Sequence, residues 1–230
     1  MPNMNMELLK RKLIVSCQPV THGPMDRVET IVAMAQAAVE GGASGLRIEG
    51  VENVRAVARA VNVPIVGIVK RDLDDFPVRI TPFEADVQAL ADGGAQIIAV
   101  DATARRRPAT VAALLRAIHG AGCIAMADCA TEADGVAANE LGFEIVATTL
   151  SGYTAETETA SEEPDYALMS AWSSRGFCVV AEGRLKTARD AARALEAGAF
   201  AVTVGSAITR VEHITEWFVE ALDSAGGARS

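Results

Sequence analysis

The sequence predicts a single (β/α)8 TIM barrel of the phosphate-binding type, and three features of the 230-residue chain support this fold class. Hydrophobic runs of strand length alternate with helical patterns along the whole chain. These runs are rich in valine and isoleucine and almost unbroken by polar residues, as are strands buried on both faces of a parallel sheet. Similar segments recur at intervals of roughly 50 residues, or two strand–helix units, which is the internal period of a barrel built from repeated units.

Eight segments fit buried strands, and the segments between them have the apolar periodicity of helices. The predicted strands are Leu13–Cys17, Gly45–Glu49, Pro64–Lys70, Ile97–Ala102, Cys123–Cys129, Glu144–Leu150, Cys178–Glu182 and Ala201–Ser206. The clearest helical patterns are Val28–Glu40, Glu84–Ala91, Val111–Ala117, Ala133–Leu141, Ala188–Ala197 and Ile214–Leu222. The alternative is an open doubly wound sheet, which usually has fewer strands and a glycine-rich turn after the first one. Gln18-Pro19-Val20 stands at that point instead, so the barrel is favoured.

The helix boundaries carry regular signals. Thr81-Pro82-Phe83-Glu84 predicts a capping hydroxyl, a proline at the first helical position and a carboxylate that reaches back. The same spacing of polar residues occurs at Asp26/Glu29, Thr131/Asp134 and Thr187/Asp190. Glycines that predict left-handed helix ends lie in the segments 40–43, 92–95, 140–143 and 196–199, each before an even-numbered strand.

The domain organisation follows from these elements. Residues 1–12 are predicted to be a tail or a short helix, residues 13–223 the barrel, and residues 224–230 a C-terminal tail. The acidic stretch Glu156–Asp165 predicts an exposed loop before the sixth helix. Trp172 and Trp217 lie on helical patterns and are expected to be packing residues. Barrels of this kind often bury a helical face in a homodimer, and Trp217-Phe218 are candidates for such a face.

Composition excludes several classes of partner. Thirty acidic and 21 basic residues give a net charge of −9, without a sustained basic stripe, so neither nucleic acid nor an anionic membrane is an expected partner. The three histidines lack ligand spacing, and the four cysteines form no CxxC pair, so no metal site is predicted. The sequence shows no signal peptide and no apolar stretch of about 20 residues, and we therefore expect a cytoplasmic protein with reduced cysteines.

Polar residues stand at the carboxyl ends of most of the predicted apolar strands. They are Cys17-Gln18, Arg47 and Glu49, Lys70-Arg71-Asp72, Asp101 and Thr103, Asp128, Thr148-Thr149, Glu182-Gly183-Arg184 and Gly205-Ser206. The active site of such a barrel lies at the carboxyl ends of its strands. Stability alone does not explain this pattern, so we interpret these positions as the rim of an active site.

Lys70 and Glu182 are the candidate catalytic pair. A lysine in a barrel mouth is desolvated, which disfavours its charged form and makes it a usable base or Schiff-base amine. Because strands 3 and 7 are opposite in a ring of eight, the two side chains are expected to face one another, as proton removal and delivery at one carbon require. The alternatives are a lysine paired with Asp72 and a structural ion pair of Glu182.

The loops after strands 7 and 8 are candidates for a phosphate site. Gly183 and Gly205-Ser206 allow backbone amides to approach phosphate oxygens, and Arg210 lies one turn further, where it would clamp the group with two hydrogen bonds. The alternative is a set of ordinary tight turns with a surface arginine. Arg105-Arg106-Arg107 has two open interpretations, a solvated loop or a share in orienting an anionic ligand.

Eight segments together resemble the family of N-acetylmannosamine-6-phosphate 2-epimerases. These segments are 14–18, 45–50, 67–72, 80–82, 126–128, 148–154, 181–184 and 204–210, and the resemblance extends from about Leu13 to Leu222. It implies interconversion of N-acetylmannosamine 6-phosphate and N-acetylglucosamine 6-phosphate in sialic-acid and amino-sugar catabolism, without a cofactor.

The resemblance also implies roles for particular residues. Lys70 and Glu182 would be the catalytic pair, and Gln18, Arg47 and Asp128 would bind the substrate together with the Gly205-Ser206 and Arg210 region. Some family members carry an amide at the position of Glu49, so Glu49 is not assigned a catalytic role. The loop from Thr154 to Glu163 matches the family little beyond its start.

Two other functions remain compatible with the residues. One is another phosphosugar barrel enzyme, either an aldolase that uses Lys70 as a Schiff base or a pentose-phosphate epimerase. The other is a sugar-phosphate sensor without catalysis, since a fold and a phosphate site do not guarantee turnover. The presence of both Lys70 and Glu182 favours an enzyme over a sensor.

Overall fold

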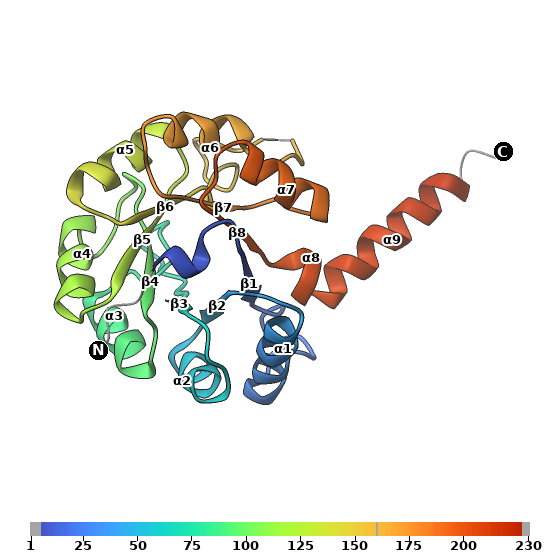
Figure 1. Ribbon diagram of the computed structural model, residues 1–230, viewed down its shortest axis with the longest axis horizontal. Coiled ribbons are helices and arrows are strands. Elements are labelled where there is room, and N and C mark those ends of the chain that lie inside the picture. The colour runs from blue at the N-terminus through green and yellow to red at the C-terminus, as the bar shows by residue number, and fades with distance from the viewer. Residues whose placement is uncertain (1–5, 160, 227–230) are drawn as a thin grey trace.

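The computed structural model describes residues 6–159 and 161–226. Within these residues, eight parallel strands form a closed barrel in the order β1 to β8, and β8 pairs with β1 to complete the ring (Figure 1). Helices surround the strands on the outside. The (β/α)8 barrel predicted from the sequence is therefore confirmed.

The strands begin within one residue of the predicted starts, and several of them end earlier than predicted. They are β1 (Leu13–Cys17), β2 (Gly45–Glu49), β3 (Ile65–Ile68), β4 (Ile97–Asp101), β5 (Ile124–Asp128), β6 (Ile145–Ala147), β7 (Val179–Glu182) and β8 (Ala201–Val204). The largest differences are at β3 and β6. There, Val69-Lys70 and Thr148–Leu150 leave the ladder and form the rim of the barrel.

The helices include α2, which was not among the helical patterns identified in the sequence. They are the 3-10 helix η1 (Met6–Leu9), α1 (Val28–Glu40), α2 (Val51–Ala60), α3 (Glu84–Gly93), α4 (Val111–Gly120), α5 (Glu132–Leu141), α6 (Tyr166–Ser173), α7 (Ala188–Glu196), α8 (Ser206–Thr209) and α9 (Val211–Gly226). No helix of the described residues is long and apolar enough to cross a membrane.

Two of the predicted helix caps are confirmed and two are wrong. Thr131 and Thr187 form complete capping boxes with the carboxylates three residues later. Thr81 does not cap α3, because its hydroxyl accepts a hydrogen bond from the Val69 amide, 3.3 Å away, and its φ is +46°. Asp26 accepts a hydrogen bond from the His22 amide and therefore does not cap α1.

The interior of the barrel changes from apolar to polar along each strand. Side chains at alternate positions point inward, and the lower inward positions form one buried cluster that includes Ile14, Val66, Met126 and Val180. Two residues further along these strands stand Ser16, Ile68, Asp128 and Glu182. The period of the strand therefore places polar side chains above a dry core, at the carboxyl ends of most strands.

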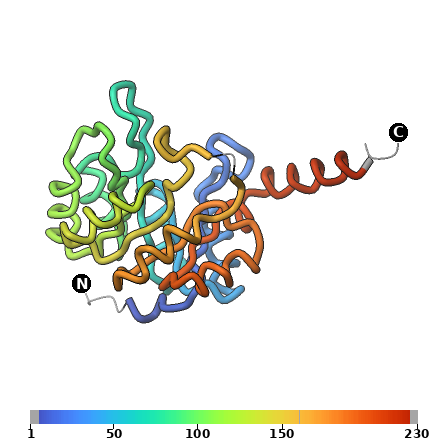
Figure 2. The backbone as a smooth tube through the Cα atoms, turned by 90° about the horizontal axis from the view of Figure 1, so that it is seen from above, coloured from blue at the N-terminus to red at the C-terminus, as the bar shows by residue number. Residues whose placement is uncertain are grey.

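Helix α9 does not cover the barrel. It begins beside β8 and projects away from the strands, as the two perpendicular views show (Figures 1 and 2). Phe218 and Leu222 are each 70% exposed on it. The helix includes residues 224–226 of the predicted C-terminal tail. Residues 1–5 and 227–230, which belong to the two predicted tails, lie outside the described residues.

Candidate active site

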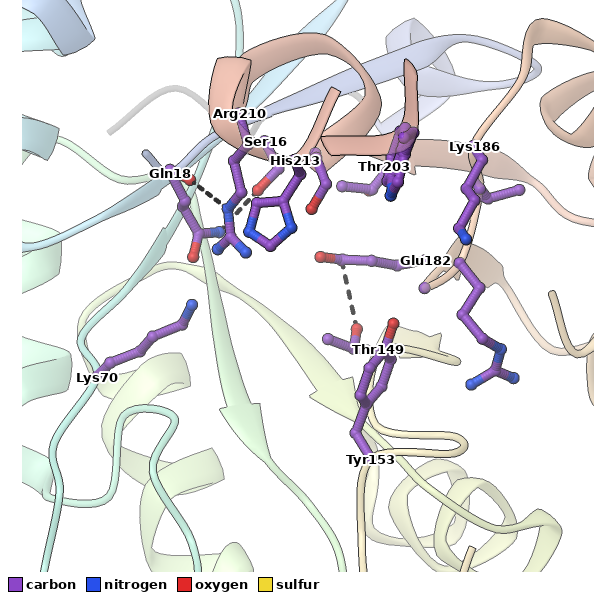
Figure 3. A pocket seen from close by; sticks show the side chains of 16 residues that line it. Ser16, Gln18, Lys70, Thr149, Tyr153, Glu182, Lys186, Thr203, Arg210 and His213 are labelled. Atoms are coloured by element: carbon purple, nitrogen blue, oxygen red, sulfur yellow. Dashed lines mark hydrogen bonds between the residues drawn. The ribbon is translucent and has the colours of Figure 1, made fainter. Parts of the chain in front are cut away.

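A cavity opens at the carboxyl ends of the strands (Figure 3). It consists of two adjoining hollows of about 420 Å³ and 400 Å³. The residues that line both are Gln18, Lys70, Thr149, Tyr153 and Glu182. The first hollow continues to Gly183, Gly205-Ser206 and Arg210, so it brings together most of the site residues predicted from the sequence.

Lys70 reaches the cavity just beyond β3. Its backbone is held by an antiparallel bridge to Ile80 and by a hydrogen bond from its amide to Glu49 Oε1, 3.2 Å away. Among the described residues, no hydrogen bond or ion pair holds its Nζ atom. Burial and the positive charges of Arg47 and Arg210 together lower the pKa of Lys70 to about 8, against the opposing effect of Glu49 and Glu182.

The alternative ion pair of Lys70 with Asp72 is wrong. Asp72 Oδ1 lies 2.6 Å from Arg79 Nε, and both side chains are mostly exposed. The loop after β3 therefore uses Asp72 to hold its own Arg79. Lys70 extends in the other direction, into the cavity.

Glu182 enters the cavity from the side opposite Lys70, as Figure 3 shows. Burial raises the pKa of Glu182 to about 7, and Asp128 contributes to the rise, while Arg47 and Lys70 oppose it. Arg47 Nη1 also donates a hydrogen bond to Glu182 Oε2 over 3.0 Å, so the ion pair considered as an alternative is present as well. The carboxyl group nevertheless lines the cavity, where it can exchange a proton near neutral pH.

Arg47 and Asp128 form a buried ion pair beneath the cavity. Arg47 Nη2 lies 2.6 Å from Asp128 Oδ2, and Nη1 lies 3.1 Å from Oδ1. The Arg47 side chain is 1% exposed and that of Asp128 is fully buried. The two carboxylates, Asp128 and Glu182, raise the pKa of the guanidinium despite its burial. Arg47 lines the second hollow, whereas Asp128 lies behind Arg47 and Thr149.

The far end of the first hollow is suited to an anion. Gly183 has φ of +104°, which turns the backbone sharply after β7. Gly205 lies against Ser16, so a Cβ atom at this position would lie 3.3 Å from Ser16 Cβ. Arg210 Nε donates a hydrogen bond to the Gln18 carbonyl over 2.9 Å, which leaves the outer nitrogens of the guanidinium facing the hollow.

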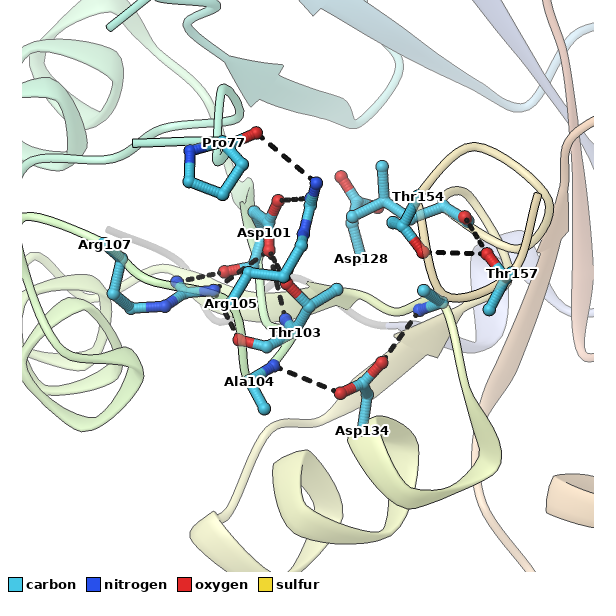
Figure 4. Close-up of polar contacts among 12 residues, drawn as sticks. Pro77, Asp101, Thr103, Ala104, Arg105, Arg107, Asp128, Asp134, Thr154 and Thr157 are labelled. Carbon is cyan, nitrogen blue, oxygen red and sulfur yellow. Dashed lines mark hydrogen bonds and ion pairs between the residues drawn. The ribbon is translucent and has the colours of Figure 1, made fainter. Parts of the chain in front are cut away.

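Two of the three consecutive arginines after β4, Arg105 and Arg107, are not solvated, whereas Arg106 is exposed. Arg105 Nη2 lies 2.5 Å from Asp101 Oδ2 and Arg107 Nη2 lies 2.9 Å from Oδ1, and the two arginine side chains are only 15% and 11% exposed (Figure 4). Arg106 lies over the ring of Phe76 instead. Asp101 and Arg105 line the second hollow, so this cluster forms one wall of the cavity.

Sequence reasoning missed several residues that line the cavity: Ser16, Tyr153, Lys186, Thr203, His213 and Trp217. Trp217 was expected to be a packing residue, but its ring lines the cavity, 5.2 Å from Lys186 Nζ. The spacing of Arg210, His213 and Trp217 by three and four residues is a helical face, and this signal was available in the sequence. Trp172 is fully buried, as predicted. In the described part of the chain, no group of three histidine, cysteine or carboxylate side chains is arranged to hold a metal ion.

Comparison with known proteins gives consistent results. A family profile described as "Putative N-acetylmannosamine-6-phosphate epimerase" matches residues 31–224. The chain is 54% identical over 220 residues to a putative N-acetylmannosamine-6-phosphate 2-epimerase from Pasteurella multocida, with 96% of each chain covered. It is 55% identical over 213 residues to the protein of the same description from Haemophilus influenzae, with 93% and 92% covered.

Comparison with solved structures also indicates a relationship to N-acetylmannosamine-6-phosphate 2-epimerases. The N-acetylmannosamine-6-phosphate 2-epimerase from Clostridium perfringens superposes with a TM-score of 0.92 at 37% identity, covering 96% of this chain and 98% of that one. A deoxyribose phosphate aldolase from Aeropyrum pernix has a TM-score of 0.65 at 16% identity, covering 89% and 90%, and shares the fold alone. From the family profile, these relatives and the superposition, we conclude that the chain belongs to the N-acetylmannosamine-6-phosphate 2-epimerase family.

Proposed function

We propose that this protein is a cofactor-independent 2-epimerase that interconverts N-acetylmannosamine 6-phosphate and N-acetylglucosamine 6-phosphate, in amino-sugar and sialic-acid catabolism. One observation carries the proposal: Lys70 and Glu182 reach one cavity from opposite sides, with pKa values of about 8 and about 7. Each group therefore changes its protonation near neutral pH, which suits proton transfer at a single carbon.

The chemistry begins from the open-chain sugar, in which C2 lies beside the C1 aldehyde. In one direction of the reaction, Lys70 is the base, and its neutral amine takes the proton from C2. The electron pair of the C–H bond then moves toward O1, which forms an enolate. The neutral carboxyl group of Glu182 then gives its proton to the opposite face of C2, and O1 returns to an aldehyde. The pair ends as ammonium and carboxylate, the state that catalyses the reverse direction.

The remaining predicted residues have proposed roles in binding. Arg210, Gly183 and Gly205-Ser206 bind the phosphate at the far end of the first hollow. Gln18 contacts the sugar between the two hollows, and Arg47 contacts it from the floor and stabilises the enolate oxygen. Because Asp128 is fully buried beneath Arg47, we propose that it assists binding by holding Arg47 in place. A phosphosugar is charged and does not cross a bilayer freely, so we place this activity in the cytoplasm.

An NMR time course with purified protein in D2O tests the proposed function. With N-acetylmannosamine 6-phosphate as substrate, N-acetylglucosamine 6-phosphate should appear with deuterium at C2 and without an added cofactor. Unphosphorylated N-acetylmannosamine should react poorly. Borohydride treatment in the presence of substrate should leave no covalent adduct on Lys70, whereas a trapped adduct would indicate a Schiff-base aldolase.

We also propose that the protein forms a homodimer through α9. In a (β/α)8 barrel a helix covers each strand, but here α9 projects away from β8. An apolar groove of about 370 Å³ remains beside β8, and its lining includes Leu13, Leu195, Val202 and Ile208. Phe218 and Leu222 are spaced to form one helical face. We propose that the α9 helix of a second copy fills this groove with that face.

Light scattering tests this assembly. The wild-type protein should have the mass of a dimer at micromolar concentration, and the double variant Phe218→Glu/Leu222→Glu should have the mass of a monomer. Arg116→Glu provides a matched control, because Arg116 is exposed on α4, on the other side of the barrel from α9. A monomeric wild-type protein would contradict the proposal.

A further inference from the structure

Two consecutive threonines follow β6, and both hydrogen-bond to Glu182 of β7. The hydroxyl of Thr148 bonds to the backbone of Glu182, and the hydroxyl of Thr149 lies beside its carboxyl group. Thr148 is 1% exposed, and Thr149 lines the cavity, where Figure 3 shows its contact with Glu182. The mechanism above assigns no role to either residue.

Thr148 fixes the backbone of Glu182 at the point where β7 ends. Its Oγ1 donates to the Glu182 carbonyl over 2.8 Å and accepts from the Glu182 amide over 3.0 Å. Immediately afterwards the chain turns through Gly183 and Arg184, which have φ values of +104° and +56°. Since β6 ends at Ala147, the side chain of Thr148 replaces the missing strand as the hydrogen-bonding partner of Glu182.

Thr149 has one hydroxyl hydrogen and two carboxyl neighbours. Its Oγ1 lies 2.6 Å from Asp128 Oδ1 and 3.3 Å from Glu182 Oε2. The shorter distance indicates that the hydrogen points to Asp128 Oδ1, while Asp128 Oδ2 forms the ion pair with Arg47. A lone pair of Oγ1 then faces Glu182. A lone pair accepts a hydrogen bond from a neutral carboxyl group and repels an ionised one.

The other groups that face Glu182 set the background for this contact. Arg47 from β2 and Lys70 beyond β3 favour its ionised form, and Asp128 from β5 favours its neutral form. A hydrogen bond donated by Thr149 to Glu182 would also favour the ionised form, but the single hydroxyl hydrogen is directed to the nearer Asp128. His213 and Lys186 line the same hollow. Because these charges are present in any variant of Thr149, a change at the hydroxyl can be measured against a constant background.

We propose that Thr148 and Thr149 are positioning residues for Glu182: Thr148 fixes its backbone, and Thr149, oriented by Asp128, holds a proton on its carboxyl group. The proton lies on Glu182, whose carboxyl group donates a hydrogen bond to Thr149 Oγ1. The hydroxyl of Thr149 in turn donates to Asp128 Oδ1. This orientation prepares Glu182 to act as the acid that delivers a proton to C2. The inference rests on the role of Glu182 proposed above.

A titration of Glu182 in the protein without substrate tests the role of Thr149. Protein labelled with 13C at the glutamate carboxyl carbons is followed by NMR, and the signal lost in Glu182→Gln identifies the residue. The pKa should fall by about half a unit to one unit in Thr149→Val, because the acceptor for the proton is lost. Thr149→Ser, which keeps the hydroxyl, should restore it. Where valine prevents folding, Thr149→Ala gives the same comparison.

An unchanged or raised pKa in the valine variant would overturn the role of Thr149. Thr148→Val should lower kcat by about tenfold and leave the pKa of Glu182 within about 0.3 unit of the wild type, because it loosens the backbone alone. Thr148→Ser should recover kcat, and an unchanged kcat in Thr148→Val would overturn the role of Thr148. The titration needs no turnover. An inactive protein with the expected titration would therefore contradict only the proposed function, and an active enzyme with no shift would contradict only this inference.

Discussion

The two walls of the cavity hold their ionisable groups in different ways. On the β7 wall, Glu182 is fixed by hydrogen bonds to its backbone and its carboxyl group, and Arg47 adds an ion pair at 3.0 Å. On the β3 wall, the backbone of Lys70 is bridged to Ile80, but among the described residues its Nζ atom has no hydrogen bond or ion pair. One wall therefore presents a carboxyl group held by several contacts, and the other presents an amine without a hydrogen-bond or ion-pair partner among the described residues.

This difference matches the demands of proton transfer at one carbon. The four-carbon stem of a lysine lets the amine follow C2 as the open-chain sugar moves, and no partner has to be released first. A carboxyl group held by its surroundings retains both its direction and its protonation state. We therefore expect substitutions on the β3 wall to act mainly by removing the chemical group, and those on the β7 wall to act also through geometry.

The largest effect should come from Lys70→Ala. The variant has no base at C2, so kcat for epimerisation should fall by about 10³-fold or more, and exchange of the C2 proton with deuterium should disappear with it. Both are measured in the same NMR experiment in D2O. Lys70→Arg, which keeps a positive charge but not a titrating amine, should be equally inactive. Exchange at the wild-type rate in Lys70→Ala would rule out Lys70 as the base.

Glu182→Gln should lower epimerisation by about 10²- to 10³-fold. If Glu182 acts on the face opposite Lys70, the C2 proton of one epimer should still exchange, with retention of configuration, because Lys70 remains intact. The two rates are compared in D2O for each epimer. A parallel loss of exchange and epimerisation would show instead that Glu182 opens the pyranose ring, since the closed sugar has no aldehyde to acidify C2.

Arg210 lies outside both walls. Its substitution by alanine should therefore affect substrate binding rather than the chemical step. The phosphate is held similarly in the ground state and the transition state, so KM should rise by about 10- to 100-fold while kcat changes little. Steady-state kinetics with N-acetylmannosamine 6-phosphate measure both constants. A fall in kcat with unchanged KM would contradict a phosphate-binding role for Arg210.

The pH dependence of kcat/KM should depend on the ionisation of both Lys70 and Glu182. In the proposed mechanism, the active enzyme carries one proton in total on Lys70 and Glu182. Below pH about 7 both groups are protonated and no base is available, and above pH about 8 both have lost their protons and no acid remains. The profile of kcat/KM should therefore be bell-shaped with a maximum between these values, falling about tenfold per pH unit on either side. A profile flat from pH 6 to 9 would contradict the assignment.

The sequence was sufficient to predict the barrel and the placement of Lys70 and Glu182 on opposite sides of its cavity, because both depend on local patterns. A buried strand that ends in a charged residue is visible in the sequence at Lys70 and Glu182, and the eightfold order of strands places them opposite one another. The ion pair of Arg47 and Asp128 was not predictable in the same way. It joins residues 81 positions apart, and only the closed barrel brings them together.

The arginine cluster and α9 show two further limits of prediction from the sequence. Three consecutive arginines are typical of a solvated loop. The burial of Arg105 and Arg107 depends on Asp101, whose surroundings exist only in the folded chain. The periodicity of α9 predicts a helix but not its direction, because an amphipathic face packs equally well on its own barrel or on a second copy. Thr148-Thr149 stood among the polar strand ends in the sequence, but their hydroxyl partners depend on the register of β6 and β7.

The smallest effects should come from substitutions of two acidic residues near Lys70. These substitutions test how strongly each carboxylate influences the pKa of the Lys70 amine. Asp72 is held by Arg79, so Asp72→Asn should change kcat by less than about twofold and leave the pKa of Lys70 in place. Glu49 instead raises the pKa of Lys70, and its Oε1 accepts the Lys70 amide proton. Glu49→Gln should therefore lower that pKa and move the alkaline limb of the kcat/KM profile toward neutral pH. An equal shift in both variants would mean that Asp72 acts on Lys70 at long range, and the β3 wall would then be less open than its contacts indicate.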